Sequence, residues 1–344
     1  FLLAMGDHLV DSKALRRLVV QSGNLCVAAD SSPRYVAVSE ATRLALSEGR
    51  VVAVGKSLPR FDAVDMGFFV ASRSIFPVLR ECLDGGQCSL NEAKRAWMQA
   101  GNDFLSVDCS GYFWLDVDTP ADRSRAERLL RQRLTKDRDG IVARLVNRPL
   151  STRLSGWLVS RPVSSNEITM SSFGLSFFAA ALLASGVPLL MASGGLLAQA
   201  ASILDGCDGE VARLRGTATP GGAVFDAVLD RLADAMVIAG LVWGARSAGG
   251  GDTILALGAL ALSASLVLSY SESRFESAFG RPLPAAGARI PATRDVRVFL
   301  VMLGGLFNVA PLALAAIAAL SGAEIVRRLR QAVALAVPGN LGAG

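Results

Sequence analysis

Hydrophobic and polar residues alternate in two different ways along this chain, and the change falls near residue 135. Before it, short apolar runs such as NLCVAA and AVDMGFFVA are separated by polar turns and helix-like stretches. Strands that alternate with helices predict an α/β sheet. After it, the apolar runs become long and charged residues gather between them, which is typical of membrane helices. The pattern therefore predicts an α/β half followed by an all-α membrane half.

We divide the chain into an α/β domain at residues 1–135, a basic interfacial linker or helix at 136–165, a six-helix transmembrane domain at 166–335 and a tail at 336–344. The six spans are expected at about 167–185, 187–204, 222–245, 253–270, 297–309 and 310–326. The last two are short for a span of roughly 20 residues.

The linker at 136–165 places apolar Ile141, Leu145, Leu154, Trp157 and Leu158 among four arginines. This pattern is typical of a helix that lies on an anionic membrane surface. A charged linker between two domains is the alternative interpretation.

Arginines are concentrated in alternate loops of the membrane half. Arg213 and Arg215 follow the second span, five arginines lie between the fourth and fifth spans, and the opposite loops carry only Arg246. The positive-inside rule then predicts a multi-pass protein of the plasma membrane, with both ends and the N-terminal domain in the cytoplasm. The net charge of +5 comes largely from these flanks, so we expect no nucleic-acid partner. The single histidine, His8, excludes a Ser-His-Asp triad in the membrane half.

Four aspartates lie in or beside the apolar helices of the second half, in the segment DGCDGEVARLRGTATPGGAVFDAVLD: Asp205, Asp208, Asp226 and Asp230. Carboxylates near a bilayer are costly, so such a group indicates a function. The i,i+3 and i,i+4 spacings put each pair on one helical face. Two such faces turned toward each other offer hard oxygen ligands to Mg²⁺ or a similar ion. Helix capping and pairing with nearby arginines is the alternative interpretation.

Read in full, Asp205-x2-Asp208-Gly209-x2-Ala212-Arg213-x8-Gly222-x3-Asp226-x3-Asp230 resembles the CDP-alcohol phosphotransferase motif, with every position filled. The resemblance covers about residues 145–330. It implies that a hydroxyl displaces CMP from a CDP-alcohol. It also implies two Mg²⁺ or Mn²⁺ ions held by Asp205, Asp208 and Asp226, a homodimer, and membrane lipid as a partner. Asp230 would be the general base and a further metal ligand.

The same resemblance assigns the nucleotide to five positions: Asp205, Gly209, Ala212, Arg213 and Gly222. An acceptor that carries a phosphate suits arginines near the cytoplasmic ends of the spans, and we predict Arg274, Arg294 and Arg297 for this role. The competing interpretation of these arginines is a topology signal. Asp234 continues the i+4 series, and we interpret it as a bystander.

In the first half, MGDH, GK (55–56), FDAVDMGFF and WLDVDTPAD resemble, in order, motifs of sugar-phosphate nucleotidyltransferases, and above all of inositol-1-phosphate cytidylyltransferase. The resemblance covers about residues 1–135. It implies a partial Rossmann-like domain in which Asp7 and Asp118 hold Mg²⁺. The family's opening Gly-rich nucleotide loop is absent from this sequence. We therefore expect this domain to be incomplete and unable to transfer a nucleotide.

The fusion of the two halves resembles bifunctional enzymes that make CDP-inositol and then join it to inositol phosphate. We therefore expect a Mg-dependent phosphotransferase with a CDP-inositol donor and an inositol phosphate acceptor. Two other substrate pairs stay open: CDP-diacylglycerol with a polar alcohol phosphate, and CDP-inositol with a lipid acceptor. A cation transporter is the alternative of another class, although its carboxylates would lie nearer mid-span.

Overall fold

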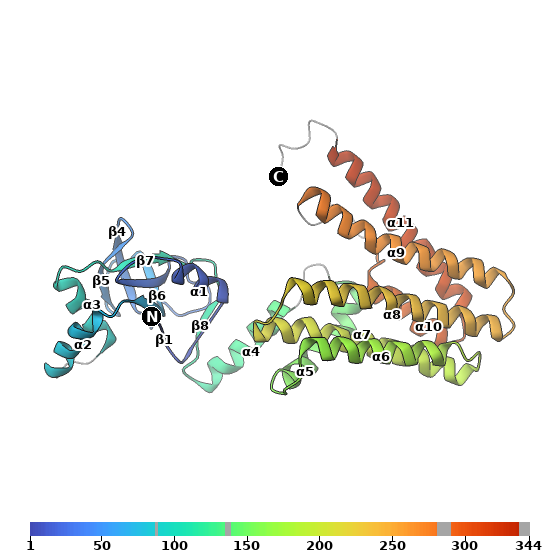
Figure 1. The fold of residues 1–344 in the computed structure, drawn as a ribbon, viewed down its shortest axis with the longest axis horizontal. Coiled ribbons are helices and arrows are strands. Elements are labelled where there is room, and N and C mark those ends of the chain that lie inside the picture. The colour runs from blue at the N-terminus through green and yellow to red at the C-terminus, as the bar shows by residue number, and fades with distance from the viewer. Residues whose placement is uncertain (87–88, 135–138, 281–289, 337–344) are drawn as a thin grey trace. The chain divides into compact units, whose positions relative to one another are not determined.

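The computed structural model describes residues 1–86, 89–134, 139–280 and 290–336. The chain forms two compact units, Phe1–Leu130 and Arg131–Gly344. The first contains strands and short helices, and the second contains helices (Figure 1).

The N-terminal unit is built on a six-stranded sheet in the order β1-β6-β3-β7-β5-β4, and β2 and β8 form a separate two-stranded sheet. Its elements are β1 (Leu2–Ala4), β2 (His8–Val10), α1 (Ser12–Val19), β3 (Leu25–Asp30), β4 (Arg43–Ser47), β5 (Arg50–Gly55), β6 (Ala63–Ala71), α2 (Ile75–Asp84), α3 (Leu90–Gln99), β7 (Leu105–Asp108), β8 (Trp114–Asp116) and α4 (Pro120–Leu134).

Strand β3 is buried along its whole length because both of its faces are covered. Leu25 and Val27 belong to a core with Trp97 of α3. Cys26 belongs to a second core on the other face, with Leu18 of α1. Alternate side chains of a strand point to opposite faces, so this strand supplies two cores at once.

The expectation of a Rossmann-like sheet is not confirmed, because the sheet is mixed and closes into a small barrel. Only β3 and β7 pair in parallel among the described strands. β4 pairs with both β5 and β6, which closes the ring. The β4–β5 hairpin turns through Glu48 and Gly49, with φ of +49° and +78°, and a turn with two positive φ angles joins antiparallel strands tightly. Alternating polarity alone does not distinguish parallel from antiparallel pairing.

The second unit consists of η1 (Ala143–Asn147), a π-helical turn, followed by α5 (Arg148–Leu158), α6 (Ser165–Leu183), α7 (Pro188–Arg215), α8 (Pro220–Ser247), α9 (Thr253–Phe279), α10 (Arg294–Leu306) and α11 (Ala310–Ala336). Helices α6 to α11 fall where the six spans were predicted. Three of them, α7, α9 and α11, are long and apolar enough to cross a membrane. The expected count of six spans is therefore not confirmed by length and composition. Helix α10 has only 13 residues.

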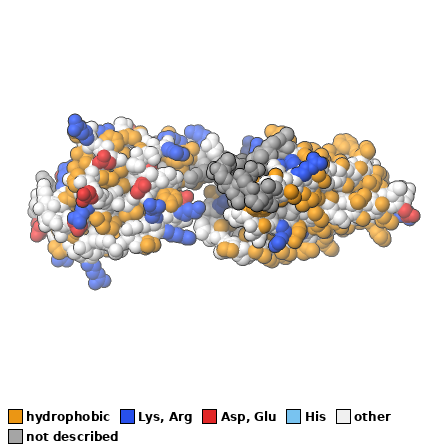
Figure 2. Space-filling model, turned by 90° about the horizontal axis from the view of Figure 1, so that it is seen from above, with side chains coloured by type: hydrophobic (Ala, Val, Ile, Leu, Met, Phe, Trp, Pro, Cys, Tyr) orange, Lys and Arg blue, Asp and Glu red, His pale blue; other side chains and the backbone are white. Residues whose placement is uncertain are grey.

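Backbone contacts through glycine bring α7 and α10 close together. A Cβ at Gly195 of α7 would lie 2.7 Å from the carbonyl oxygen of Met302, and one at Gly305 of α10 would lie 2.6 Å from that of Met191. Small residues allow such close approach between membrane helices. Apolar side chains are frequent on the visible surface of this unit, whereas charged ones are scattered over the N-terminal unit (Figure 2).

The apolar residues of the predicted linker differ in their burial. Ile141, Leu145 and Trp157 are exposed, as an interfacial helix requires. Leu158 is buried and Leu154 partly buried, because both pack in a small core with α7. Alternation along the sequence did not separate these two faces.

Candidate functional site

The polar connection between α7 and α8 is shaped by local sequence. Helix α7 ends at Gly216, whose φ of +67° is the left-handed conformation that favours glycine. Helix α8 begins at Pro220, after the N-cap Thr219, whose hydroxyl oxygen accepts from the Gly222 N–H at 3.1 Å. This short connection joins the C-terminal half of α7 to the N-terminal half of α8, and these halves carry the predicted aspartates.

Three of these aspartates meet in space. Asp205, Asp208 and Asp226 each offer a carboxylate oxygen, and the three oxygens lie within 4.8 Å of one another. Asp208 is buried. Three converging carboxylates are a donor set of the kind that Mg²⁺ and Mn²⁺ prefer, so the residues fit the divalent ion that the motif implies.

Helix α6 orients two of these carboxylates. Thr169 Oγ1 donates to Asp208 Oδ2 at 2.5 Å, and Ser172 Oγ donates to Asp205 Oδ1 at 3.4 Å. The Gly209 N–H donates to the other Asp208 oxygen. Such outer contacts fix the direction of a metal-binding carboxylate. Thr169 was not among the predicted site residues.

Asp230 lies apart from that group of three and is held by an arginine of α10. Arg294 Nη1 lies 2.8 Å from Asp230 Oδ1 and 2.5 Å from Asp205 Oδ2. The guanidinium therefore joins the last turns of α7 to α8. One of the arginines predicted to bind the acceptor, Arg294, thus lies directly at the aspartates.

Asp234, interpreted above as a bystander, anchors this arginine. Its side chain is only 5% exposed and contacts Arg294 Nε at 2.9 Å and Arg297 Nη2 at 3.4 Å. Arg297 is itself buried and stabilises the Asp234 carboxylate by this contact. Arg274 is exposed on α9. The i+4 step from Asp230 to Asp234 was the sequence signal for this anchor.

The predicted nucleotide positions lie along the same turns. Arg213 folds back over Gly209, since a Cβ added at Gly209 would lie 3.2 Å from Arg213 Nη1. Ala212 is buried. At the start of α8, a Cβ at Gly222 would lie 3.2 Å from Thr219 Oγ1 and 3.9 Å from Asn166 Oδ1. The glycines therefore keep these turns open where side chains would crowd them.

The N-terminal unit holds a second acidic group. Asp7, His8 and Asp116 offer ligand atoms within 4.8 Å of one another. The prediction paired Asp7 with Asp118, but strand pairing puts His8 opposite Asp116. The hydrogen bond with His8 lowers the pKa of Asp7 below its usual value, while burial raises that of Asp116. Asp118 is exposed beyond the end of β8.

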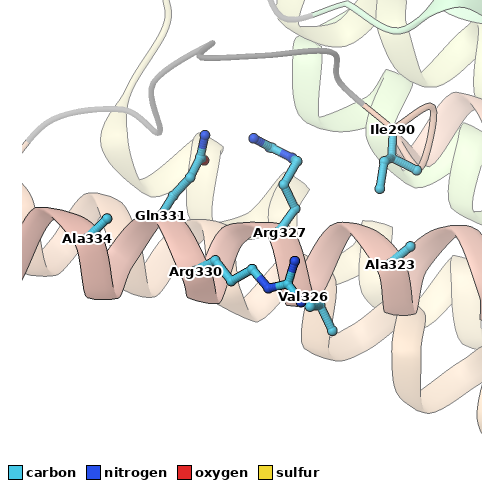
Figure 3. A pocket seen from close by; sticks show the side chains of 7 residues that line it. All are labelled: Ile290, Ala323, Val326, Arg327, Arg330, Gln331 and Ala334. Atoms are coloured by element: carbon cyan, nitrogen blue, oxygen red, sulfur yellow. The ribbon is translucent and has the colours of Figure 1, made fainter.

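The described residues of the helical unit also form surface pockets elsewhere. One, of about 450 Å³, is lined by α11 with Arg327, Arg330 and Gln331 and by Ile290 (Figure 3). Another, of about 410 Å³, lies on α8 between Ala223 and Leu232. Neither is lined by one of the four motif aspartates, so the predicted chemistry does not lie in these pockets.

Comparison with known proteins supports the sequence motif. Residues 163–325 match the CDP-alcohol phosphatidyltransferase family. The chain is 43% identical over 329 residues to a protein of Rubrobacter xylanophilus named bifunctional IPC transferase and DIPP synthase, which covers 96% of this chain and 74% of that protein. It is 31% identical over 166 residues to the archaetidylinositol phosphate synthase of Methanothermobacter thermautotrophicus, covering 48% and 74% respectively.

Among solved structures, the phosphatidylinositol phosphate synthase of Mycobacterium tuberculosis with CDP-DAG bound is 24% identical, with a TM-score of 0.47 and coverage of 57% of this chain and 98% of that one. The sequence relatives and the matched motif confirm the predicted resemblance. This chain belongs to the CDP-alcohol phosphatidyltransferase family.

Proposed function

We propose that the helical unit transfers a phosphoalcohol group from a CDP-alcohol to an acceptor hydroxyl and releases CMP. The observation that carries this proposal is the convergence of Asp205, Asp208 and Asp226 within 4.8 Å. The acceptor oxygen forms a bond to the phosphorus that bears the alcohol, and the bond from that phosphorus to the CMP oxygen breaks. The proton of the acceptor hydroxyl passes to Asp230.

Each residue has a distinct part in this reaction. Asp205, Asp208 and Asp226 would hold two Mg²⁺ or Mn²⁺ ions, to which Asp230 would be a further ligand. When bound, such ions neutralise the charge that develops on the pyrophosphate oxygens. Gly209, Ala212 and Gly222 leave space for the nucleotide, and Arg213 binds a phosphate oxygen. Asp230 is the general base, and its contact with Arg294 at 2.8 Å fixes the carboxylate in place.

The acceptor is an alcohol that carries a phosphate. Arg294 presents its guanidinium beside Asp230, and Asp234, itself paired with Arg297, holds Arg294 from the buried side. A planar guanidinium fixed in this way suits a phosphate dianion. Inositol phosphate is the acceptor that fits the names of the relatives, and CDP-inositol is the donor. Arg274, exposed on α9, is a further candidate for the same phosphate.

A lipid synthase is the second substrate assignment. The match to an archaetidylinositol phosphate synthase covers about half of this chain. The surface pocket on α8 between Ala223 and Leu232 lies on the helix that carries Asp226 and Asp230. This pocket would accept the hydrocarbon of a CDP-diacylglycerol donor or of a lipid acceptor. A cation transporter is less well supported because residues 163–325 match the CDP-alcohol phosphatidyltransferase family.

The membrane setting follows from the same helices. We propose that α6 to α11 cross the plasma membrane six times, with the aspartates and the N-terminal unit on the cytoplasmic side. Two copies would form a homodimer in lipid. The N-terminal unit would be a cytidylyltransferase-like domain, and in the whole protein it would supply the CDP-alcohol that the helical unit consumes.

The test uses detergent-purified protein with Mg²⁺ and labelled CDP-inositol or CDP-diacylglycerol, each with and without inositol-1-phosphate. The pair that releases CMP identifies donor and acceptor. Asp230→Asn should lower CMP release about 10³-fold because a general base is lost, while Mn²⁺ binding is largely retained. Glu324→Gln is the matched control, because Glu324 is a buried carboxylate held by arginines of α11. Equal activity of Asp230→Asn and this control would contradict the proposal.

A further inference from the structure

A row of buried polar side chains lies between α7 and the segment that precedes α6. Glu210 of α7 is fully buried. Its carboxylate accepts from Ser151 Oγ at 2.8 Å and Ser155 Oγ at 2.7 Å, and it lies 2.5 Å from Arg148 Nη1. Arg148 also holds both oxygens of Asp139, at 2.7 and 2.9 Å. Glu210 is therefore satisfied on both oxygens by one partner helix, α5.

The contact row continues toward the N-terminus of α7 on the same face. Gln199 Nε2 donates to Asn147 Oδ1 of η1 at 2.7 Å. Gly206 faces α5, since a Cβ there would lie 3.6 Å from that of Ser151. Positions 199, 206 and 210 recur at helical spacing. One face of α7 is thus joined to η1 and α5 over three turns.

The C-terminal end of α7 is joined to the same segment. The Arg215 guanidinium donates to the carbonyl oxygens of Leu158 at 2.9 Å and of Val159 at 3.1 Å. These are carbonyls at the end of α5 that lack partners within the helix. The rotation of α7 about its own axis is therefore set by contacts on both sides of its aspartates.

We propose that Glu210 is a positioning residue that fixes the rotation of α7, and so places Asp205 and Asp208 for the reaction. This inference rests on the proposed function of those aspartates. A carboxylate lies roughly 6 Å from the axis of its helix, so a rotation of about 10° moves it by about 1 Å. Displacement of that size costs up to about 10²-fold in rate.

A buried ion pair has the directional character that this role needs. Pairs of this kind contribute little net stability, and their best-attested use is to specify one packing arrangement over another. Glu210 faces α5, whereas Asp208 faces Thr169 of α6. The two acids, two residues apart, thus lie against different helices, and Glu210 acts on the reaction only through α7.

The experiment compares Glu210→Gln with Glu324→Gln, which also loses the charge of a buried, arginine-paired carboxylate, but on α11. Three quantities are measured on the full chain in detergent: the dissociation constant for Mn²⁺, obtained from the spectroscopic signal of unbound Mn²⁺, kcat for CMP release, and the midpoint of thermal unfolding. We expect Glu210→Gln to weaken Mn²⁺ binding and lower kcat by about tenfold each, while its unfolding midpoint falls no further than that of Glu324→Gln.

Ser155→Ala removes one neutral hydrogen bond from Glu210 and provides a milder variant, with an expected loss of about threefold in Mn²⁺ affinity. Wild-type Mn²⁺ affinity in both Glu210→Gln and Ser155→Ala would overturn the inference, whatever the thermal midpoints. Asp208→Asn distinguishes failure of the proposed function from failure of the positioning role of Glu210. If it also binds Mn²⁺ normally, the proposed function fails. If it alone loses binding, only the positioning role of Glu210 fails.

Discussion

Among the residues that the structure describes, two groups of three side chains could hold a metal ion, and their surroundings differ. In both, the ligand atoms lie within 4.8 Å of one another. Asp7 and Asp116 have side chains 42% and 37% exposed, and their contacts are within the group, through His8. Asp205 is 17% exposed, and hydroxyls of α6 and a guanidinium of α10 hold the aspartates of its group.

The close spacing of carboxylates does not by itself make a reactive site. Outer-shell contacts orient ligands and raise metal affinity, and exclusion of water strengthens each charge interaction. The helical group has both features, whereas Asp7 and Asp116 of the N-terminal group are more exposed than Asp205. We therefore expect the two groups to differ in metal affinity and in their effect on CMP release.

The largest effect is expected from removal of a central ligand. Asp208→Asn replaces a charged oxygen that Thr169 holds at 2.5 Å, and we expect CMP release to fall by at least about 10³-fold because charge stabilisation is lost. Initial rates at saturating donor, acceptor and Mg²⁺ measure it. Restoration of the rate by excess Mg²⁺ would mean that Asp208 contributes only affinity.

A smaller effect is expected from the arginine that joins the helices. Arg294→Lys keeps the charge but loses the planar group that contacts Asp205, Asp230 and Asp234 together. We expect KM for the phosphate-bearing acceptor to rise about 30-fold, with KM for the donor changed by less than about threefold. Arg328→Lys on α11 is the matched control. Equal increases for donor and acceptor would contradict a role specific to the acceptor.

Sequence reasoning predicted the helical site better than its surroundings. Helical spacing is local, so the sequence could indicate which aspartates share a helical face, and three of the four, Asp205, Asp208 and Asp226, meet in the structure. The partners could not be predicted: Arg148 lies 62 residues from Glu210, and no periodicity connects them. In the N-terminal unit, Asp118 was predicted where the structure places Asp116, because the register of β2 with β8 decides which aspartate faces His8. Closure of the barrel through β4 and β6 is likewise a long-range pairing.

The smallest effect is expected at the exposed group of the N-terminal unit. Asp7→Asn removes one of its three candidate ligands, and because the Asp7 and Asp116 side chains are 42% and 37% exposed, we expect it to abolish only a weak class of Mn²⁺ binding. CMP release by the helical unit should stay within about twofold of wild type, because that unit carries its own metal ligands. Titration of Mn²⁺ into both proteins, together with CMP release on the same samples, measures the two effects. If Asp7→Asn lowered CMP release tenfold, the two acidic groups would have to act in one reaction, and their different surroundings would reflect two steps of that reaction instead of two independent sites.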